Sequence, residues 1–176
     1  MVAEPVVNTH AGALPYRAFI LVGILRYPAA RVDYRFTDGA TIRVGPVALT
    51  AHITAGSTRG CTSWSFPVRD GDRELQVVRI CDLMVQPGMS LVEPENYPGI
   101  RADFERSFRV LRSLPVDIFL TAHAREFGRY LIDRDGYFRH IDTWETRFRT
   151  LLEDQQRRSS RWGSTLAGAV SRWGWQ

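Results

Sequence analysis

The sequence has 176 residues, of which 44% are hydrophobic and 24% are charged. This composition indicates a folded domain and excludes an intrinsically disordered chain. All 23 basic residues are arginines, and the formal net charge is +4. Residues 157–176 hold four arginines and no acid, so the first 156 residues, with 19 arginines and 19 acids, are neutral overall. This balance excludes a nucleic-acid surface spread over the fold, and we expect no nucleic-acid partner.

The longest apolar stretch, residues 18–25, is far shorter than the roughly 20 residues that span a bilayer. We interpret it as a buried strand. The alternative, a secretory signal peptide, lacks a convincing cleavage site of small residues. The sequence therefore leaves the cellular location open.

The first half of the chain predicts strands joined by tight turns. Because an Asp-Gly pair tolerates positive φ, Asp38-Gly39 predicts a hairpin between the alternating segments on either side of it. The turn at residues 69–72 predicts a second hairpin. The expected strands are residues 18–25, 32–36, 41–44, 47–53, 62–68 and 75–80.

The pattern becomes helical after Pro98, where apolar residues recur at spacings of three and four until Pro115. This face consists of Ile100, Phe104, Phe108, Leu111 and Leu114. A short strand is then expected at residues 116–120 and a second helix at 141–156. The order of elements indicates an α/β or α+β domain with helices on one face of a sheet.

Cys61 and Cys81 lie 20 residues apart and form no CxxC pair. Both lie in strand-like surroundings, where an isolated cysteine is usually a buried thiol. We therefore expect two free thiols.

Several segments, taken together and in order, resemble the third subclass of metallo-β-lactamases. The resemblance covers roughly residues 27–156. It is carried by Tyr27 to Asp33, Asp38-Gly39, Leu49 to Trp64, Pro87-Gly88, Tyr97 to Ile100, Asp103-Phe104, Ser107-Phe108, Leu114 to Ala124 and Asp135-Gly136-Tyr137.

The resemblance implies a four-layer αββα sandwich of two similar halves, and the chain matches largely the carboxyl-terminal half. It divides the chain into a divergent amino-terminal segment at residues 1–26, a metallo-β-lactamase-like domain at 27–156 and an arginine- and tryptophan-rich tail at 157–176. Enzymes of this family are typically periplasmic or secreted and hydrolyse β-lactams with a zinc-bound hydroxide. Several histidine or aspartate ligands must then converge on each ion.

Most of the zinc ligands that the resemblance implies are missing. The signature His-x-His-x-Asp-His is absent, and His10 is either a remnant of its beginning or a solvated turn residue. Ser57 stands where the signature Gly-His-Thr has its histidine, and a hydroxyl is a poor zinc ligand. His123 matches the ligand at the end of the last core strand. It is the one metal-site residue that we predict, with a half-buried structural histidine as the alternative.

Three further residues bear on the site. His52 and Ser57 are five residues apart, so on a strand they would face opposite ways, and we expect His52 to be a packed strand histidine. His140 is expected at the surface. Asp82 stands near the serine of the family's substrate loop, where its charge would repel a β-lactam carboxylate by about 1 kcal/mol at roughly 4 Å; the alternative is an unusual metal ligand.

These losses predict a truncated metallo-β-lactamase-like protein that is impaired in zinc-dependent β-lactam hydrolysis. One alternative is an active zinc hydrolase whose atypical site uses His10, His52, Asp82, His123 or a partner chain. The other is a non-enzymatic association module, because an uncovered apolar sheet face would favour homo-oligomers. The tail is expected to be unstructured, or else to lie at an anionic membrane surface. The sequence fixes neither the substrate nor whether the chain is a fragment of a longer enzyme.

Overall fold

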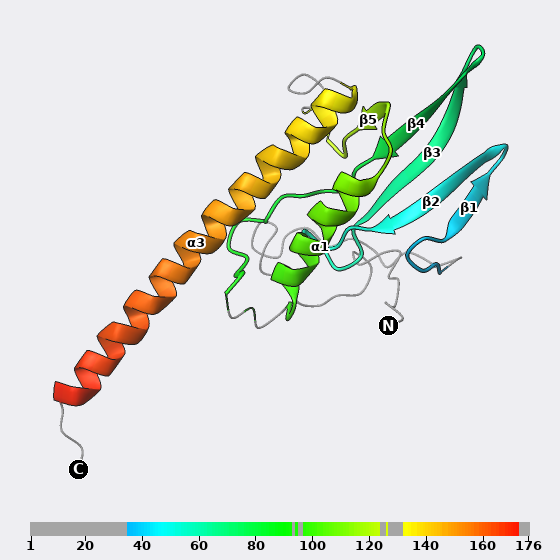
Figure 1. Cartoon of the computed structure of the whole chain (residues 1–176). Coiled ribbons are helices and arrows are strands. Elements are labelled where there is room, and N and C mark those ends of the chain that lie inside the picture. The colour runs from blue at the N-terminus through cyan, green and yellow to red at the C-terminus, as the bar shows by residue number, and fades with distance from the viewer. Residues whose placement is uncertain (1–34, 93, 95–96, 124–125, 127–131, 173–176) are drawn as a thin grey trace.

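The computed structural model describes residues 35–172, apart from residues 93, 95–96, 124–125 and 127–131, and for residues 162–172 it describes only the backbone. His10 and the strand expected at residues 18–25 lie outside the described residues. The described elements form a five-stranded mixed sheet with helices packed on one of its faces (Figure 1). The predicted α/β fold class is confirmed.

Four antiparallel strands follow one another across the sheet. They are β1 (Thr41–Val44), β2 (Val47–Ile53), β3 (Thr62–Asp70) and β4 (Arg73–Arg79). The hairpin of β3 and β4 turns at Gly71, whose φ is 61°, so the hairpin predicted from residues 69–72 is confirmed.

The hairpin predicted at Asp38-Gly39 is not found among the described residues, and residues 32–34 of its expected first strand lie outside them. The described residues before the turn, 35–37, form no strand, and β1 pairs with β2 through a turn at Gly45 instead. Asp38 and Gly39 do form a turn, but the Asp38 carboxylate accepts a hydrogen bond from Ile53 N at 2.7 Å and pairs with Arg106. The Asp-Gly pattern therefore identifies the turn, and tertiary contacts of the aspartate decide what the turn connects.

Strand β5 (Ile118–Leu120) is parallel to β4. Parallel neighbours cannot be joined by a tight turn, so a longer crossover connection links them. Helix α1 (Ile100–Ser113) lies in this crossover. Its buried residues are Ile100, Phe104, Ser107, Phe108 and Leu111. The predicted apolar face is confirmed, although Leu114 lies at the C-cap and not within the helix.

The core fills the space between the sheet and the two long helices. Helix α3 (Arg134–Arg172) lies beside α1 (Figure 1). The rings of Phe104, Phe108 and Phe148 contact one another with centroids 5.3–6.2 Å apart, while Val78 and Phe119 belong to the same core from the side of the sheet. Aromatic burial of this kind contributes more to stability than the exposed ion pairs that join the helices.

Helix α3 is longer than predicted at both ends. At its start, Asp133 Oδ1 accepts a hydrogen bond from Gly136 N at 2.8 Å, as a capping carboxylate does. At its end the helix continues to Arg172, so the expectation of an unstructured tail is wrong for residues 157–172. Ion pairs one turn apart, such as Arg158 with Asp154 at 2.6 Å, support the continuation. No helix in the described part of the chain is long and apolar enough to cross a membrane.

His140 lies in the core, which corrects the surface position expected from the sequence. Because α3 begins at Arg134, His140 shares a helix face with Tyr137 and Trp144, and its ring contacts Phe119 at 5.1 Å. Burial lowers the pKa of His140 to about 4. The Glu126 carboxyl, 3.6 Å from His140 Nδ1, would favour the protonated ring if ionised, but the cost of desolvating a buried cation is the larger effect.

The buried His140 predicts a loss of stability in acid. Its pKa is near 6.5 in the unfolded chain and about 4 in the folded one, so the unfolded state takes up a proton first as the pH falls. The neutral His140 therefore contributes roughly 3 kcal/mol to the free energy of unfolding above pH 6.5, and this contribution declines between pH 6.5 and 4. Urea unfolding at several pH values should show this decline in the wild type but not in His140→Gln.

His52→Gln is the matched control, because His52 is only half-buried and its pKa is lowered less strongly. A free-energy difference between wild type and His140→Gln that stays constant from pH 7 to pH 4 would contradict the assignment.

Candidate functional site

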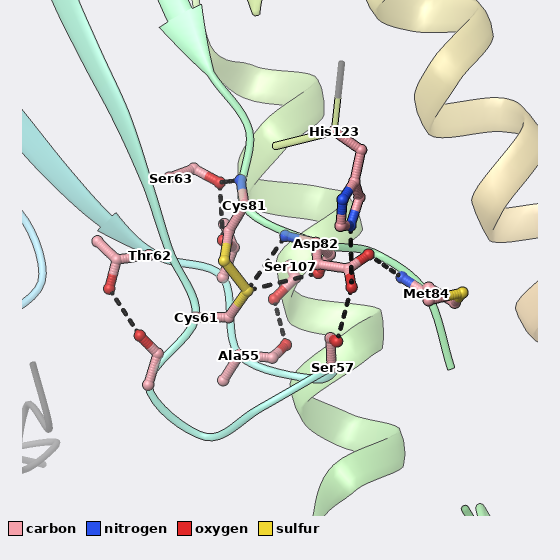
Figure 2. Close-up of a disulfide and its surroundings, with 12 residues drawn as sticks. Ala55, Ser57, Cys61, Thr62, Ser63, Cys81, Asp82, Met84, Ser107 and His123 are labelled. Carbon is pink, nitrogen blue, oxygen red and sulfur yellow. Dashed lines mark hydrogen bonds and ion pairs between the residues drawn. A yellow bond between two sulfur atoms is a disulfide. The ribbon is translucent and has the colours of Figure 1, made fainter. Parts of the chain in front are cut away.

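Three loops meet at one edge of the sheet (Figure 2). Strand β2 is antiparallel to β3 and β3 to β4, while β4 is parallel to β5, so β2, β4 and β5 all end at this edge. Ser57 follows β2, Asp82 follows β4 and His123 follows β5. The carboxyl ends of neighbouring strands are a common place for binding sites in such sheets.

The Asp82 carboxylate lies at the centre of this cluster. Its Oδ2 accepts hydrogen bonds from Ser57 Oγ at 3.2 Å and from Gln86 Nε2 at 3.2 Å, and its Oδ1 accepts one from Met84 N at 2.9 Å. The imidazole Nε2 of His123 lies 3.8 Å from Oδ2. The sequence interpretation treated Asp82 as a residue of the substrate loop; the structure shows that it joins the two other loops.

His123 directs a buried nitrogen at this carboxylate. Its side chain is 44% exposed as a whole, yet Nε2 itself is buried and makes no hydrogen bond among the described residues. The main chain is held in place, since Thr121 Oγ1 and Glu126 N both donate to the carbonyl of His123, at 2.8 and 3.0 Å. The predicted site residue therefore lies in the cluster with an unused donor atom.

The expectation of free thiols at Cys61 and Cys81 is wrong, because the two form a disulfide with Cα atoms 5.8 Å apart. Cys61 immediately precedes β3 and Cys81 closely follows β4, and the register that pairs Trp64 with Arg79 brings them together. Sequence spacing alone does not reveal that register. The disulfide ties the loop of Ser57 to the segment of Asp82, whose backbone N lies 3.2 Å from Cys61 Sγ.

The loop that carries Ser57 rests directly on α1. Ser107 Oγ donates to the carbonyl of Ala55 at 2.7 Å. Gly56 has a φ of 149°, and a Cβ at this position would lie 2.6 Å from Phe104 Cδ1. Only glycine allows the backbone to approach Phe104 this closely, so Gly56 lets the loop of Ser57 pack directly against α1.

Gln86 is the member of the cluster that the sequence interpretation missed. Besides Asp82, its Nε2 contacts Ser57 Oγ at 3.3 Å. The following loop is fastened to α3, because Gln155 accepts from Leu91 N at 2.7 Å and donates to Met89 O at 2.9 Å. A shallow groove of about 640 Å³ lies between this loop and α3 and includes Gln86 in its lining. No sequence pattern identifies Gln86, because residues 81–86 form neither a helix nor a strand and the contact with Ser57 exists only in the folded chain.

The other histidines do not join the cluster. His52 lies on β2, as predicted, and its Nε2 is 2.8 Å from Ser65 Oγ. Burial lowers its pKa, against the opposing effect of Asp38. His140 lies in the core, and His10 is outside the described residues.

The fold is found in solved structures of metallo-β-lactamases. FEZ-1 from Legionella gormanii is 33% identical, with a TM-score of 0.70, over 74% of this chain and 55% of that enzyme. A Cronobacter sakazakii enzyme with a HARLDQ motif is 32% identical, with a TM-score of 0.69, over 78% and 57%. The subclass B3 enzyme BJP-1 of Bradyrhizobium japonicum is 26% identical, with a TM-score of 0.69, over 76% and 55%.

This chain is similar in sequence and fold to metallo-β-lactamases, over about three quarters of its length. It spans a little over half the length of these relatives. The family predicted from the sequence is confirmed. No protein-family model matches the sequence.

The metallo-β-lactamases of subclass B3 are zinc enzymes, and the cluster of this chain does not fit a catalytic zinc centre. Such a centre has three protein ligands and one open position. Among residues 35–172, with the gaps given above, no group of three His, Cys, Asp or Glu side chains converges. Asp82 and His123 supply two donors, and the third neighbour is a hydroxyl.

A serine nucleophile is not supported either. In a catalytic triad the serine hydroxyl is hydrogen-bonded to a histidine, which accepts its proton and is oriented by a carboxylate. Here Ser57 Oγ donates to Asp82, and His123 also faces Asp82. The carboxylate therefore takes the place that the imidazole would need.

The disulfide predicts a substantial loss of stability on its removal. Replacing Cys61 and Cys81 together by alanine should lower the free energy of unfolding by about 3 kcal/mol, since the unfolded chain is no longer constrained by a loop of this size. Urea denaturation measures the change, and reduced wild type should behave like the double variant. A loss below about 0.5 kcal/mol would contradict the structural role.

Gly56→Ala should destabilise the protein more than a glycine change in open space. We expect a loss of about 2–4 kcal/mol, because the new Cβ meets Phe104 and the backbone has positive φ. Gly71→Ala is the control, since its φ of 61° is also positive but nothing lies within 4 Å of the added Cβ; it should cost about 1 kcal/mol. Equal losses in thermal or urea unfolding would show that Gly56 does not support the loop.

Proposed function

We propose that this polypeptide, by itself, is a metallo-β-lactamase-like protein with little or no zinc-dependent β-lactam hydrolysis. The observation that supports this is the donor set of the cluster: one carboxylate and one imidazole, with Ser57 as the third neighbour. Zinc chemistry in this superfamily requires an ion that stays bound and makes its water acidic near neutral pH. Two donors hold the ion too weakly for that.

The charge of Asp82 adds to the impairment. Its carboxylate is 22% exposed and lies where the family's substrate loop meets the β-lactam. A second carboxylate about 4 Å away would be repelled by roughly 1 kcal/mol in water and more in a less polar site.

The alternative is an active zinc-dependent hydrolase with an atypical site. One observation favours it: His123 Nε2 is buried and has no hydrogen-bond partner among the described residues, as a ligand awaiting an ion would be. Further donors would then come from residues outside the described ranges, His10 among them, or from another chain. A role for the protein as a homo-oligomeric association module stays a prediction.

Metal analysis and turnover distinguish these proposals. We expect purified protein to retain well under one zinc per chain after gel filtration, and nitrocefin hydrolysis to stay at the rate of the His123→Gln variant even with zinc added. A related enzyme such as FEZ-1, purified in parallel, is the positive control for both assays. About one tightly bound zinc per chain, lost together with turnover on chelation, would defeat the proposal.

A further inference from the structure

We propose that the last part of α3, residues 153–172, binds the surface of an anionic lipid bilayer. These residues are called the extension below. The extension lies along the headgroups, with apolar side chains on the bilayer side and arginines at the level of the lipid phosphates. The proposal goes beyond the proposed function, because it involves none of the residues that meet at Asp82.

The extension begins where the core of the domain ends. Leu152 is the last buried residue of α3 among those whose side chains are described, and residues 153–161 are all exposed or only partly buried. The backbone nevertheless stays helical to Arg172. At 1.5 Å per residue the extension is about 30 Å long. Its end, red in Figure 1, projects beyond the sheet and α1.

An apolar line along α3 continues into the extension. Phe148 and Leu152 lie on this line and are buried in the core. After two polar positions, the helical repeat of 3.6 residues places Trp162, Leu166 and Val170 on the same line. The sequence thus keeps an apolar face on the helix beyond the point at which the described core ends.

The composition of the extension indicates that it packs against a partner. Gly163 and Gly168 lie within it, and glycine is a poor helix former. Helices in proteins are stabilised mainly by the packing of an apolar face, and less by the propensities of their residues. The core supplies such packing as far as Leu152. Beyond it, an apolar surface outside the domain would supply the same stabilisation.

The extension carries the charge that an anionic surface attracts. Residues 155–172 include Arg157, Arg158, Arg161 and Arg172 and no acid. By the helical repeat, these four positions fall together on one side of the helix, next to the apolar line. A basic face beside an apolar face that includes tryptophan and leucine is typical of helices that lie in the plane of a membrane surface.

Ion pairs within the helix do not cancel this attraction. Arg157 lies 3.9 Å from Glu153 and 3.7 Å from Asp154, and Arg158 lies 2.6 Å from Asp154. All of these side chains are at least 42% exposed. Exposed pairs are weak, so lipid phosphates can replace the carboxylates. With both acids counted against the four arginines, the extension still has a net charge of +2.

A lipid surface fits the extension better than a second copy of the chain. Two extensions side by side would bring eight arginines together, and like charges repel one another. A bilayer supplies an apolar phase and phosphates at the same time. Tryptophan favours the headgroup level, and Trp173 and Trp175 follow Trp162 in the sequence. Because no helix in the described part of the chain can cross a membrane, the helix would lie on its surface.

Cosedimentation of the full-length protein with vesicles tests the charge of the extension. We expect binding to phosphatidylcholine vesicles with about 30% phosphatidylserine to be roughly tenfold or more stronger than to pure phosphatidylcholine, and to weaken as salt is added. Arg157→Gln, Arg158→Gln and Arg161→Gln together should weaken it roughly a hundredfold, since each arginine near such a surface contributes about fivefold.

The matched control removes three arginines from the hairpins of the sheet. Arg43, Arg69 and Arg73 are exposed there, away from the end of α3 (Figure 1). Changing these three residues to glutamine alters the net charge of the protein by the same amount and should leave binding within about twofold of wild type, because attraction to the surface falls off within a Debye length.

A second pair of variants tests the apolar line. Leu166→Ser with Val170→Ser should weaken binding to the anionic vesicles by about tenfold or more, because two apolar side chains no longer enter the bilayer. Ala167→Ser is the control, since residue 167 falls off the line by the helical repeat. It should bind like wild type. Circular dichroism and urea unfolding verify that each variant keeps its fold.

Four results would overturn the inference: wild type fails to bind anionic vesicles at low salt, both triple-arginine variants lose binding equally, Leu166→Ser with Val170→Ser binds like wild type, or sizing shows that the extension pairs two copies of the chain in place of binding lipid. Zinc content and nitrocefin turnover are separate measurements, so none of these results bears on the proposed function.

Discussion

The carboxylate of Asp82 lies at the centre of a cluster of side chains from the three loops that follow β2, β4 and β5. It receives hydrogen bonds from Ser57, Gln86 and the backbone of Met84, and it faces His123. A partly buried carboxylate must be compensated by such donors, since an uncompensated charge is costly away from water. The side chains of the three loops therefore meet at this carboxylate.

The loops are held by interactions that require no metal. The Cys61–Cys81 disulfide joins the loop of Ser57 to the segment of Asp82, and Gln155 fastens the segment beyond Gln86 to α3. In enzymes where zinc completes the structure, the ion itself joins its ligand loops. Here the disulfide and the hydrogen bonds do so.

The sequence predicts those parts of the fold that follow from local patterns. The spacing of Ile100, Phe104, Phe108 and Leu111 predicts α1 and its buried face, because a helix repeats every 3.6 residues. The errors come from tertiary constraints. The disulfide depends on the register of β3 and β4, and the burial of His140 depends on where α3 begins. The contacts of Asp38 with Ile53 and Arg106 link positions far apart in sequence and change what its turn connects.

The same distinction between local sequence patterns and tertiary contacts applies to the site. The resemblance to the family predicts His123 as a metal-site residue and predicts that Ser57 stands in place of a histidine ligand. The role of Asp82 and Gln86 was not predicted, because their contact with Ser57 exists only once β2 and β4 end at the same edge of the sheet.

The central claim is that the cluster offers one imidazole and one carboxylate to a metal ion. X-ray absorption at the zinc edge, on concentrated protein with one equivalent of added zinc, counts imidazole ligands through the scattering of their outer ring atoms. The account predicts at most one imidazole on the zinc and otherwise oxygen ligands, and any imidazole signal should be lost in His123→Gln. Two or more imidazoles on the zinc would contradict it.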